Sequence, residues 1–389
     1  MIKLGITHLL TEKQEWFDGK SVGLLTNHTG VDENLTYTIE LLSKFNLVSL
    51  FSPEHGLWGA AQDGVKIVDS TYNQNHETTK TQKQALQVYS LYGTTPLAWT
   101  EVLQTLDVII YDIQDVGARY YTYLGTLLEV MKALEWTMES GKCVECIVAD
   151  RPNPIGGTSI EGPMLESDYT SLVGPYPIPV RYGMTIGEVA RLFHSEQGFN
   201  FPLKVAGLQG WHREMWYSET GLPWVPPSPN MPTLETATLY PGTCLFEGTN
   251  VSEGRGTTKP FEYIGAPWID KEKLATQLNE REFPGVLFRP IVFTPQFSKY
   301  DGEVCHGVAI HITNPKQVVP IEILVWMLRI LIDEHSSEFE FRETHFDRLA
   351  GSSTLRKTLL RGTPCDEIIE TWAIDEKQFR ARREPYLLY

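Results

Sequence analysis

Short apolar runs alternate with longer amphipathic stretches through the first 150 residues, and this alternation limits the possible folds more than any other feature of the sequence. Continuous apolar runs such as VII and CIVA are typical of strands buried on both faces of a parallel sheet. The amphipathic stretches between them are typical of helices that cover such a sheet. We therefore expect an α/β fold, with strands over residues 21–27, 47–51, 85–93, 107–115 and 146–150 and helices over 34–45, 96–106 and 119–140.

The pattern changes after about residue 152, where Gly and Pro become frequent. A helix is expected after Thr185, because Thr185 and Glu188 have the spacing of a capping box. The most proline-dense stretch, WVPPSPNMPTLE, is the best candidate for a boundary, and we divide the chain into residues 1–228 and 229–389. The second part is expected to be a smaller α/β domain that includes residues 271–280, 286–293, 305–313 and 320–335.

Polar residues follow the expected strands of the first part. The strand ends carry Asn27, the pair Glu54 and His55, residues 112–115 (DIQD) and residues 150–153 (DRPN). Because the carboxyl ends of parallel strands share one edge of the sheet, where ligands bind, we expect these groups to meet in space. The sequence therefore predicts a functional site at this edge.

Charge and hydropathy restrict the partners. The formal net charge is −16, which disfavours nucleic acid and anionic membrane surfaces. No run of 18 or more apolar residues and no signal peptide is visible in the sequence. We expect a cytoplasmic protein that binds neither nucleic acid nor membrane, or a secreted one if the natural start lies upstream.

Cofactor motifs are missing from the sequence. The first turn, GLLTNHTG, lacks the glycine spacing of a dinucleotide site, and no phosphate-binding P-loop occurs. A metal site could be assembled from His55, Asp63, Asp112 and Asp115, but no HxH or HExxH pairing supports it. We expect no cofactor and no metal, and a nucleotide-dependent oxidoreductase is a minor alternative.

Carboxylate chemistry is the remaining possibility. Glu54 lies in a tight turn beside Leu57 and Trp58, surroundings in which a carboxyl group can hold the proton that a general acid needs. Asp112 and Asp115 could supply a second carboxylate across a cleft, the usual equipment for glycoside hydrolysis. The alternative for Glu54 is a structural role as a helix cap or as an ion-pair partner of Arg119.

Long sequence blocks resemble the exo-β-N-acetylmuramidase family of bacterial peptidoglycan-recycling enzymes. They are GLLTNHTG, SLFSPEHGLWG, DVIIYDIQDVGARYYTY, VADRPNPIGG, RYGMTIGEVA and the run from PPSPNMPTLE through EGTNVSEGRGTT to EYIGAPW. The resemblance implies a Rossmann-like N-terminal domain, a smaller α/β C-terminal domain and a cleft between them. It also implies release of terminal β-1,4-linked N-acetylmuramic acid from the non-reducing ends of peptidoglycan fragments, without a cofactor.

Carried over by position, the resemblance makes Glu54 the best candidate for the catalytic acid. Arg119 or Arg255 would bind the lactyl carboxylate of the sugar, because a planar guanidinium suits a carboxylate. The other substrate-binding candidates are Asn27, His55, Gln114, Tyr120, Tyr121, Asn153, Asn230, Glu247, Asn250 and Glu253.

The second catalytic group stays open in the sequence. The 2-acetamido group of the substrate could attack the anomeric carbon, or a retaining or inverting mechanism could use Asp112, Asp115 or Glu253. Two other functions are also compatible with the sequence, a carbohydrate-binding protein without turnover and a metal-dependent ester or amide hydrolase.

Overall fold

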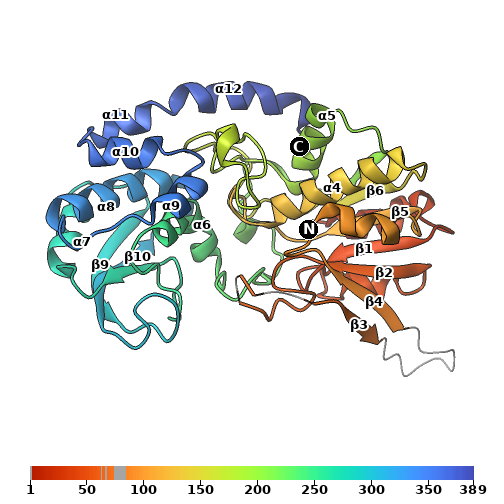
Figure 1. Ribbon diagram of the computed structural model, residues 1–389, viewed down its shortest axis with the longest axis horizontal. Coiled ribbons are helices and arrows are strands. Elements are labelled where there is room, and N and C mark those ends of the chain that lie inside the picture. Colours follow the sequence, from red (N-terminus) through yellow and green to blue (C-terminus); the bar gives the residue numbers. More distant parts are fainter. Residues whose placement is uncertain (1, 63, 66–67, 74–84) are drawn as a thin grey trace.

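A computed structural model describes residues 2–62, 64–65, 68–73 and 85–389 of the chain. The described residues form two lobes that lie side by side (Figure 1). The larger lobe contains a seven-stranded sheet in the order β3-β4-β2-β1-β5-β6-β7, parallel except for β3. Its strands are β1 (Val22–Thr26), β2 (Leu47–Ser52), β3 (Ser70–Asn73), β4 (Ala85–Ser90), β5 (Val108–Asp112), β6 (Glu145–Ala149) and β7 (Leu203–Ala206).

The central strands are buried on both faces, as their apolar runs predicted. All residues of β1, β5 and β6 are buried. Their side chains alternate between two apolar cores, since Ile109 and Val148 belong to one core whereas Ile110 and Ile147 belong to the other. The helices around this sheet are α1 (Gly5–Glu12), α2 (Thr38–Leu42), α3 (Thr100–Leu103), α4 (Tyr123–Glu139) and α5 (Ile186–Gln197). The α/β prediction is therefore confirmed.

Three helix predictions are only partly right. The helix expected over 34–45 is limited to the five residues of α2, Thr38–Leu42. The helix expected over 119–140 begins at Tyr123, because residues 119–122 form a turn whose backbone is tied to the segment near Val180 (Arg119 N–H to Val180 O, 2.8 Å). The helix expected over 96–106 is a 3-10 turn followed by the four-residue α3. The capping box is present as expected: Thr185 Oγ1 accepts from Glu188 N–H, and Glu188 Oε2 accepts from Thr185 N–H.

The smaller lobe contains a three-stranded antiparallel sheet in the order β8-β10-β9. Its strands are β8 (Tyr263–Ala266), β9 (Val286–Phe293) and β10 (Cys305–Ile312). The helices after residue 230 are α6 (Leu234–Thr243), α7 (Lys271–Asn279), α8 (Pro320–Glu334), α9 (Glu343–Ala350), α10 (Thr354–Leu360), α11 (Cys365–Glu370) and α12 (Ala373–Arg383). Helix α6 was not predicted, since Pro241 and Gly242 interrupt its pattern; complete burial of Thr236–Thr243 holds it in place.

The end of the chain returns to the larger lobe. Helix α12 crosses the top of the molecule, and the C-terminus lies near α5 (Figure 1). Arg382 pairs with Glu196 of α5, and Tyr389 Oη donates to Asp150 Oδ2 at 2.7 Å. Residues beyond 229 therefore contribute to both lobes, and the boundary at 228/229 stays a prediction.

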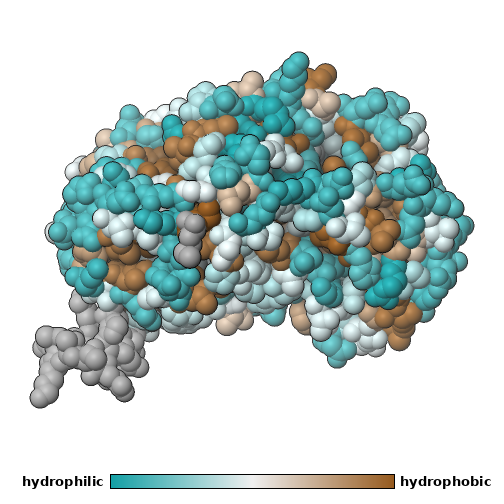
Figure 2. Space-filling view, turned by 180° about the vertical axis from the view of Figure 1, so that it is seen from behind, coloured by the Kyte–Doolittle hydropathy of each residue, from teal (hydrophilic) through white to brown (hydrophobic). Residues whose placement is uncertain are grey.

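Polar and apolar residues interleave over the face that Figure 2 shows, without one continuous apolar band. Within the described residues, no helix combines the length and the apolar character that crossing a bilayer requires.

Candidate active site

The turn after β2 positions Glu54. His55 and Gly56 have φ of 70° and 76°, so the chain reverses immediately after the carboxylate. Glu54 Oε2 accepts a hydrogen bond from Thr122 Oγ1 (2.7 Å), and Oε1 accepts from Gly64 N–H (3.1 Å). His55 Nδ1 lies 2.8 Å from Ala61 O and fixes the same turn. Glu54 is thus neither a helix cap nor a partner of Arg119, and it is held with its carboxylate toward a cavity.

This cavity has a volume of about 350 Å³ and lies between the two lobes. The larger lobe contributes Glu54, His55 and Thr122, and the smaller lobe contributes residues of α6, of the loop after it and of α9. We call this cavity the active-site pocket; its other lining residues include Tyr92, Tyr120, Tyr121, Ser171, Leu172, Ser228, Asn230, Met231, Tyr240, Cys244, Glu247, Arg255, Phe261, His345, Arg348 and Leu349.

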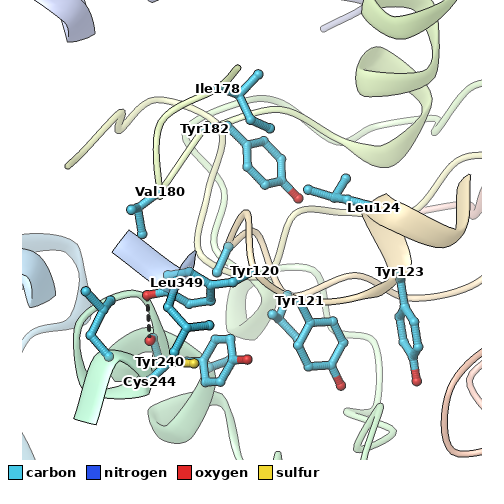
Figure 3. Packing of buried hydrophobic residues seen from close by; sticks show 14 of the residues in the cluster. Tyr120, Tyr121, Tyr123, Leu124, Ile178, Val180, Tyr182, Tyr240, Cys244 and Leu349 are labelled. Atoms are coloured by element: carbon cyan, nitrogen blue, oxygen red, sulfur yellow. Dashed lines mark hydrogen bonds between the residues drawn. The ribbon is translucent and has the colours of Figure 1, made fainter. Parts of the chain in front are cut away.

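Aromatic rings form one wall of the pocket. Tyr120 turns toward α6, where its hydroxyl donates to the carbonyl oxygens of Tyr240 and Pro241, whereas the hydroxyl groups of Tyr121 and Tyr123 point the same way as each other (Figure 3). The Tyr121 ring packs edge-on against Tyr123 and Tyr240, at centroid distances of 4.9 and 5.7 Å. Burial raises the pKa of Tyr121 far above neutrality, so its phenol is a neutral hydrogen-bond donor.

A charged chain of residues lies on the smaller-lobe side. Arg255 Nη2 donates to Glu247 Oε1 at 2.7 Å, and His345 Nε2 lies 3.7 Å from Glu247 Oε2. Burial alone would raise the pKa of Glu247, but Arg255 and His345 outweigh it and lower the pKa to about 2. Glu253 lies behind this group and pairs with Lys299 (2.8 Å) and Arg255 (3.4 Å). Glu247 is therefore an ionised carboxylate at neutral pH.

The structure brings seven of the fifteen candidate residues together around this pocket. They are Glu54, His55, Tyr120, Tyr121, Asn230, Glu247 and Arg255. Asn230 also donates to Gln62 Oε1 (3.2 Å) and so joins the smaller-lobe side to the turn that carries Glu54.

Arg119 is not in the pocket, which corrects the expectation that it could bind a lactyl carboxylate. Its side chain is fully buried, and its two terminal nitrogens donate to four backbone carbonyls, those of Pro163, Ile178, Leu349 and Ala350, at 2.8–2.9 Å. Burial lowers the pKa of Arg119 to about 10, which still leaves it charged. Arg119 therefore fastens loop 163–178 to the end of α9.

The two aspartates expected as second carboxylates do not line the pocket either. Asp112 is fully buried and pairs with Arg151 (Nε to Oδ1, 2.6 Å), while Thr38 Oγ1 donates to its other oxygen. Asp115 accepts from Gly117 N–H (2.8 Å) and from the Tyr182 hydroxyl, and burial raises its pKa to about 6 although these bonds lower it. Both carboxylates have structural partners instead of facing the cavity.

The remaining amide candidates hold backbone turns. Asn27 bonds to Tyr123 Oη, Gln114 to the carbonyls of Asp115 and Pro152, and Asn153 to Met184 O. Asn250 bonds to Glu338 O and Glu340 N in the smaller lobe. None of the four lines the active-site pocket.

Several pocket residues were missed in the sequence. Thr122 lies inside a quoted block, RYYTY, but nothing there indicates its contact with Glu54. His345 and Arg348 stand three residues apart on α9, a helix without any motif, and therefore give no local signal. Tyr240 and Phe261 are aromatic residues that the sequence alone does not distinguish from residues of the apolar core.

The described residues contain no cluster of three or more His, Cys, Asp or Glu side chains that could hold a metal ion, and Asp63 lies outside them. At the crevice where the strand order reverses, between β1 and β5, the Arg151 side chain donates to Asp112 and to Val31 O. In doubly wound folds a nucleotide would bind in this crevice. Here the guanidinium group of Arg151 lies in this crevice.

The fold and the pocket together define a two-lobed α/β protein with two carboxylates, Glu54 and Glu247, lining an aromatic pocket between the lobes. The chain belongs to the exo-beta-N-acetylmuramidase NamZ family. The N-terminal model of this family matches residues 22–235, and the C-terminal model matches residues 238–389.

Similarity to individual proteins extends over the full chain. The peptidoglycan beta-N-acetylmuramidase NamZ of Bacillus subtilis (strain 168) is 42% identical over 392 residues, which covers 100% of this chain and 91% of that protein. A crystal structure of a DUF1343 family protein from Bacteroides fragilis NCTC 9343 has a TM-score of 0.87 at 36% identity, and a second one has 0.75 at 29%. Each comparison covers 100% of this chain and 99% of the solved chain.

Proposed function

We propose that this chain is an exo-β-N-acetylmuramidase that hydrolyses the terminal β-1,4-linked N-acetylmuramic acid of peptidoglycan fragments, with Glu54 as its general acid. The observation that carries the assignment of Glu54 is its position. It is a carboxylate held by Thr122 and Gly64 at the wall of a pocket that is also lined by an ionised carboxylate, Glu247. The family and the full-length similarity to a peptidoglycan beta-N-acetylmuramidase support the substrate class.

The contact with Thr122 allows Glu54 to exist in both protonation states. A hydroxyl group donates to a carboxylate, and after rotation it accepts from a carboxylic acid. Thr122 can therefore hold Glu54 before and after it gives its proton to the glycosidic oxygen. The Gly64 N–H can only donate, so it favours the ionised product of that step.

Glu247 stabilises the positive charge that develops at the anomeric carbon. It and Glu54 are the two carboxylates among the described residues that line the pocket. Its lowered pKa keeps it ionised, as a group that stabilises an oxocarbenium-like transition state must be. Tyr121 adds a neutral donor in the same pocket, suited to bind the carbonyl oxygen of the substrate's acetamido group.

The size of the pocket suits one terminal sugar. About 350 Å³ lies at the lower end of the range of ligand-binding cavities. The wall of Tyr121, Tyr240 and Phe261 offers apolar surface to a pyranose ring. These features favour removal of single residues from a chain end.

The decisive test compares two leaving groups. Wild type and Glu54→Gln are assayed with the disaccharide N-acetylmuramyl-β-1,4-N-acetylglucosamine and with nitrophenyl β-N-acetylmuraminide. A poor leaving group needs the proton of the general acid, so we expect kcat/KM for the disaccharide to fall about 100- to 10,000-fold. The nitrophenyl substrate should lose much less, because nitrophenolate leaves without protonation.

Glu139→Gln, an exposed change at the end of α4, is the matched control and should behave as wild type. Equal losses on both substrates would show that Glu54 is not the acid. Absence of cleavage by wild type would reject the proposed activity itself.

A further inference from the structure

We propose that Arg348 binds the lactyl carboxylate of the terminal N-acetylmuramic acid and thereby selects this sugar over N-acetylglucosamine. The inference rests on the proposed function and adds the residue that distinguishes the two substrates. The two sugars differ in the lactyl ether, so the protein must recognise either its bulk or its charge. The charges around the pocket indicate recognition of the charge.

A carboxylate entering this pocket meets an unfavourable field. The chain carries a formal net charge of −16, and both Glu54 and Glu247 line the cavity. At separations of a few ångströms, repulsion between carboxylates costs several kcal/mol in a partly buried site. A cation that is not already neutralised must therefore contact the lactyl group.

The two arginines proposed from the sequence do not meet this requirement. Arg119 is fully buried and donates to four carbonyls outside the pocket. Arg255 lines the pocket, but its charge is compensated by Glu247 (2.7 Å) and Glu253 (3.4 Å). To bind the substrate, Arg255 would have to leave two carboxylates.

Arg348 meets it. This residue lies on α9, lines the pocket and forms no ion pair with the residues that the structure describes. Its single hydrogen bond joins Nη2 to His345 Nδ1 at 2.7 Å. Nε and Nη1 remain open to a ligand, and an exposed guanidinium needs little desolvation before it binds a carboxylate.

The contact with His345 also sets the orientation of Arg348. A guanidinium only donates, so His345 Nδ1 accepts and the ring proton lies on Nε2, which faces Glu247 Oε2 at 3.7 Å. The side chains of Arg255, Glu247, His345 and Arg348 thus contact one another in this order. These contacts hold Arg348 beside the pocket without neutralising it.

Arg348 lies at a junction of two cavities. A second hollow of about 390 Å³ shares Ser171 and Arg348 with the active-site pocket, and its wall includes Asp168, Glu343 and Asp347. A lactyl group directed at Arg348 therefore points toward this hollow. If the lactyl group carries a peptide, its carboxylate becomes a neutral amide, and the attraction to Arg348 is lost. We accordingly expect the enzyme to prefer sugars without a stem peptide.

The test uses three nitrophenyl β-glycosides: N-acetylmuramic acid, its lactyl N-methylamide and N-acetylglucosamine. For wild type, we expect kcat/KM for the acid to exceed that for the amide by about 30- to 100-fold, the scale of a lost charge-assisted pair. In Arg348→Gln the acid should lose about the same factor, whereas the amide should change less than about threefold. Arg348→Lys should recover part of the preference for the acid, since it restores the charge without the planar fork.

Arg342→Gln is the matched control, because Arg342 is exposed just before α9 and does not line the pocket. It should retain the wild-type ratio. An Arg348→Gln enzyme that keeps the wild-type ratio of acid to amide would overturn the inference, and so would a wild type that cleaves both equally. These results require an enzyme that cleaves muramic glycosides, so they are distinct from failure of the proposed activity, in which wild type cleaves none of them.

Discussion

Two groups of charged and polar side chains each include one carboxylate from the carboxyl edge of the larger sheet, and they differ in what surrounds them. In the closed cluster, formed by Asp112, Arg151 and Thr38, the ion pair is at most 3% exposed and the free edge of the guanidinium donates to Val31 O. In the pocket cluster, formed by Glu54, Thr122, Glu247, Arg255, His345 and Arg348, the side chains surround a cavity of about 350 Å³. The first group leaves no room for a ligand, whereas the second does.

The comparison distinguishes a charge with structural partners from the carboxylate that we propose as the general acid. Asp112 and Glu54 are both acidic and both nearly inaccessible to solvent; Asp112 is the last residue of β5, and Glu54 follows the end of β2 by two residues. Asp112 is bound to a cation, which compensates its charge and fixes its position. Glu54 is bound to a hydroxyl group and a backbone amide, neither of which carries a counter-charge. The partners, and not the residue type, separate the two roles.

The largest effect is expected from breaking the closed cluster. Asp112→Asn leaves the Arg151 guanidinium buried without its counter-charge, and we expect a loss of about 3–5 kcal/mol in the free energy of unfolding. Denaturant unfolding measures this loss. The folded fraction should keep its kcat for the disaccharide, because Asp112 does not reach the pocket.

Asp107→Asn is the control at the other end of the same strand. Asp107 pairs with Lys142 on the surface, and its removal should cost less than about 1 kcal/mol. A stable Asp112→Asn protein with a hundredfold lower kcat would reverse the comparison and place Asp112 in the chemistry.

A second prediction concerns Asp150, which forms no ion pair with the residues that the structure describes. Burial raises its pKa to about 7, against a contribution from Thr185 and Tyr389 that lowers it. Between pH 4 and 7 the folded state thus retains a proton that the unfolded state releases, so stability falls as the pH rises through this window. Relative to Asp150→Asn, wild type should lose roughly 2 kcal/mol of unfolding free energy from pH 5 to pH 7.

Urea titrations at both pH values test this prediction, with Asp366→Asn as an exposed control that should follow wild type. Parallel curves for wild type and Asp150→Asn would mean that Asp150 is ionised in the folded protein. In that case its hydrogen bonds, like the ion pair of Asp112, would be strong enough to fix its charge.

The smallest of these three effects is expected at Thr122, the residue of the pocket cluster that holds Glu54. Thr122→Val removes the hydroxyl that holds Glu54 Oε2, and we expect a decrease of about tenfold in kcat/KM for the disaccharide, the value of one hydrogen bond. Thr126→Val, one turn further along α4, is the control, since its hydroxyl bonds to Thr122 O and not to Glu54. Equal activity of both variants would show that Thr122 does not position the acid.

The sequence predicted those features that depend on neighbouring residues. Apolar runs such as VGLLT and VIIYD indicated buried parallel strands, and the spacing of Thr185 and Glu188 indicated the start of α5. Glu54 was found because a distinctive block, SPEHG, follows a strand. Each of these signals lies within about ten residues of the feature that it predicts.

The roles of the arginines could not be predicted in this way, because their partners are distant in sequence. Arg119 donates to carbonyls as far as 231 residues away, and only the folded chain shows that its donors are already used. Arg348 is important for the opposite reason, since no carboxylate of the described chain neutralises it. The lack of an ion-pair partner cannot be recognised from the sequence.

The contact between Asp150 and Tyr389 has a consequence for the biosynthesis and folding of the protein. The two residues are 239 positions apart, and ribosomes add about 5–20 residues per second. The carboxyl end of β6 is therefore translated about 12–48 s before the tyrosine that completes its hydrogen bonds. During that interval Asp150 can already accept from Thr185 Oγ1 and Gly187 N–H but lacks the Tyr389 hydroxyl, so the hydrogen bonds at this edge of the larger lobe are complete only after the rest of the chain has been synthesised.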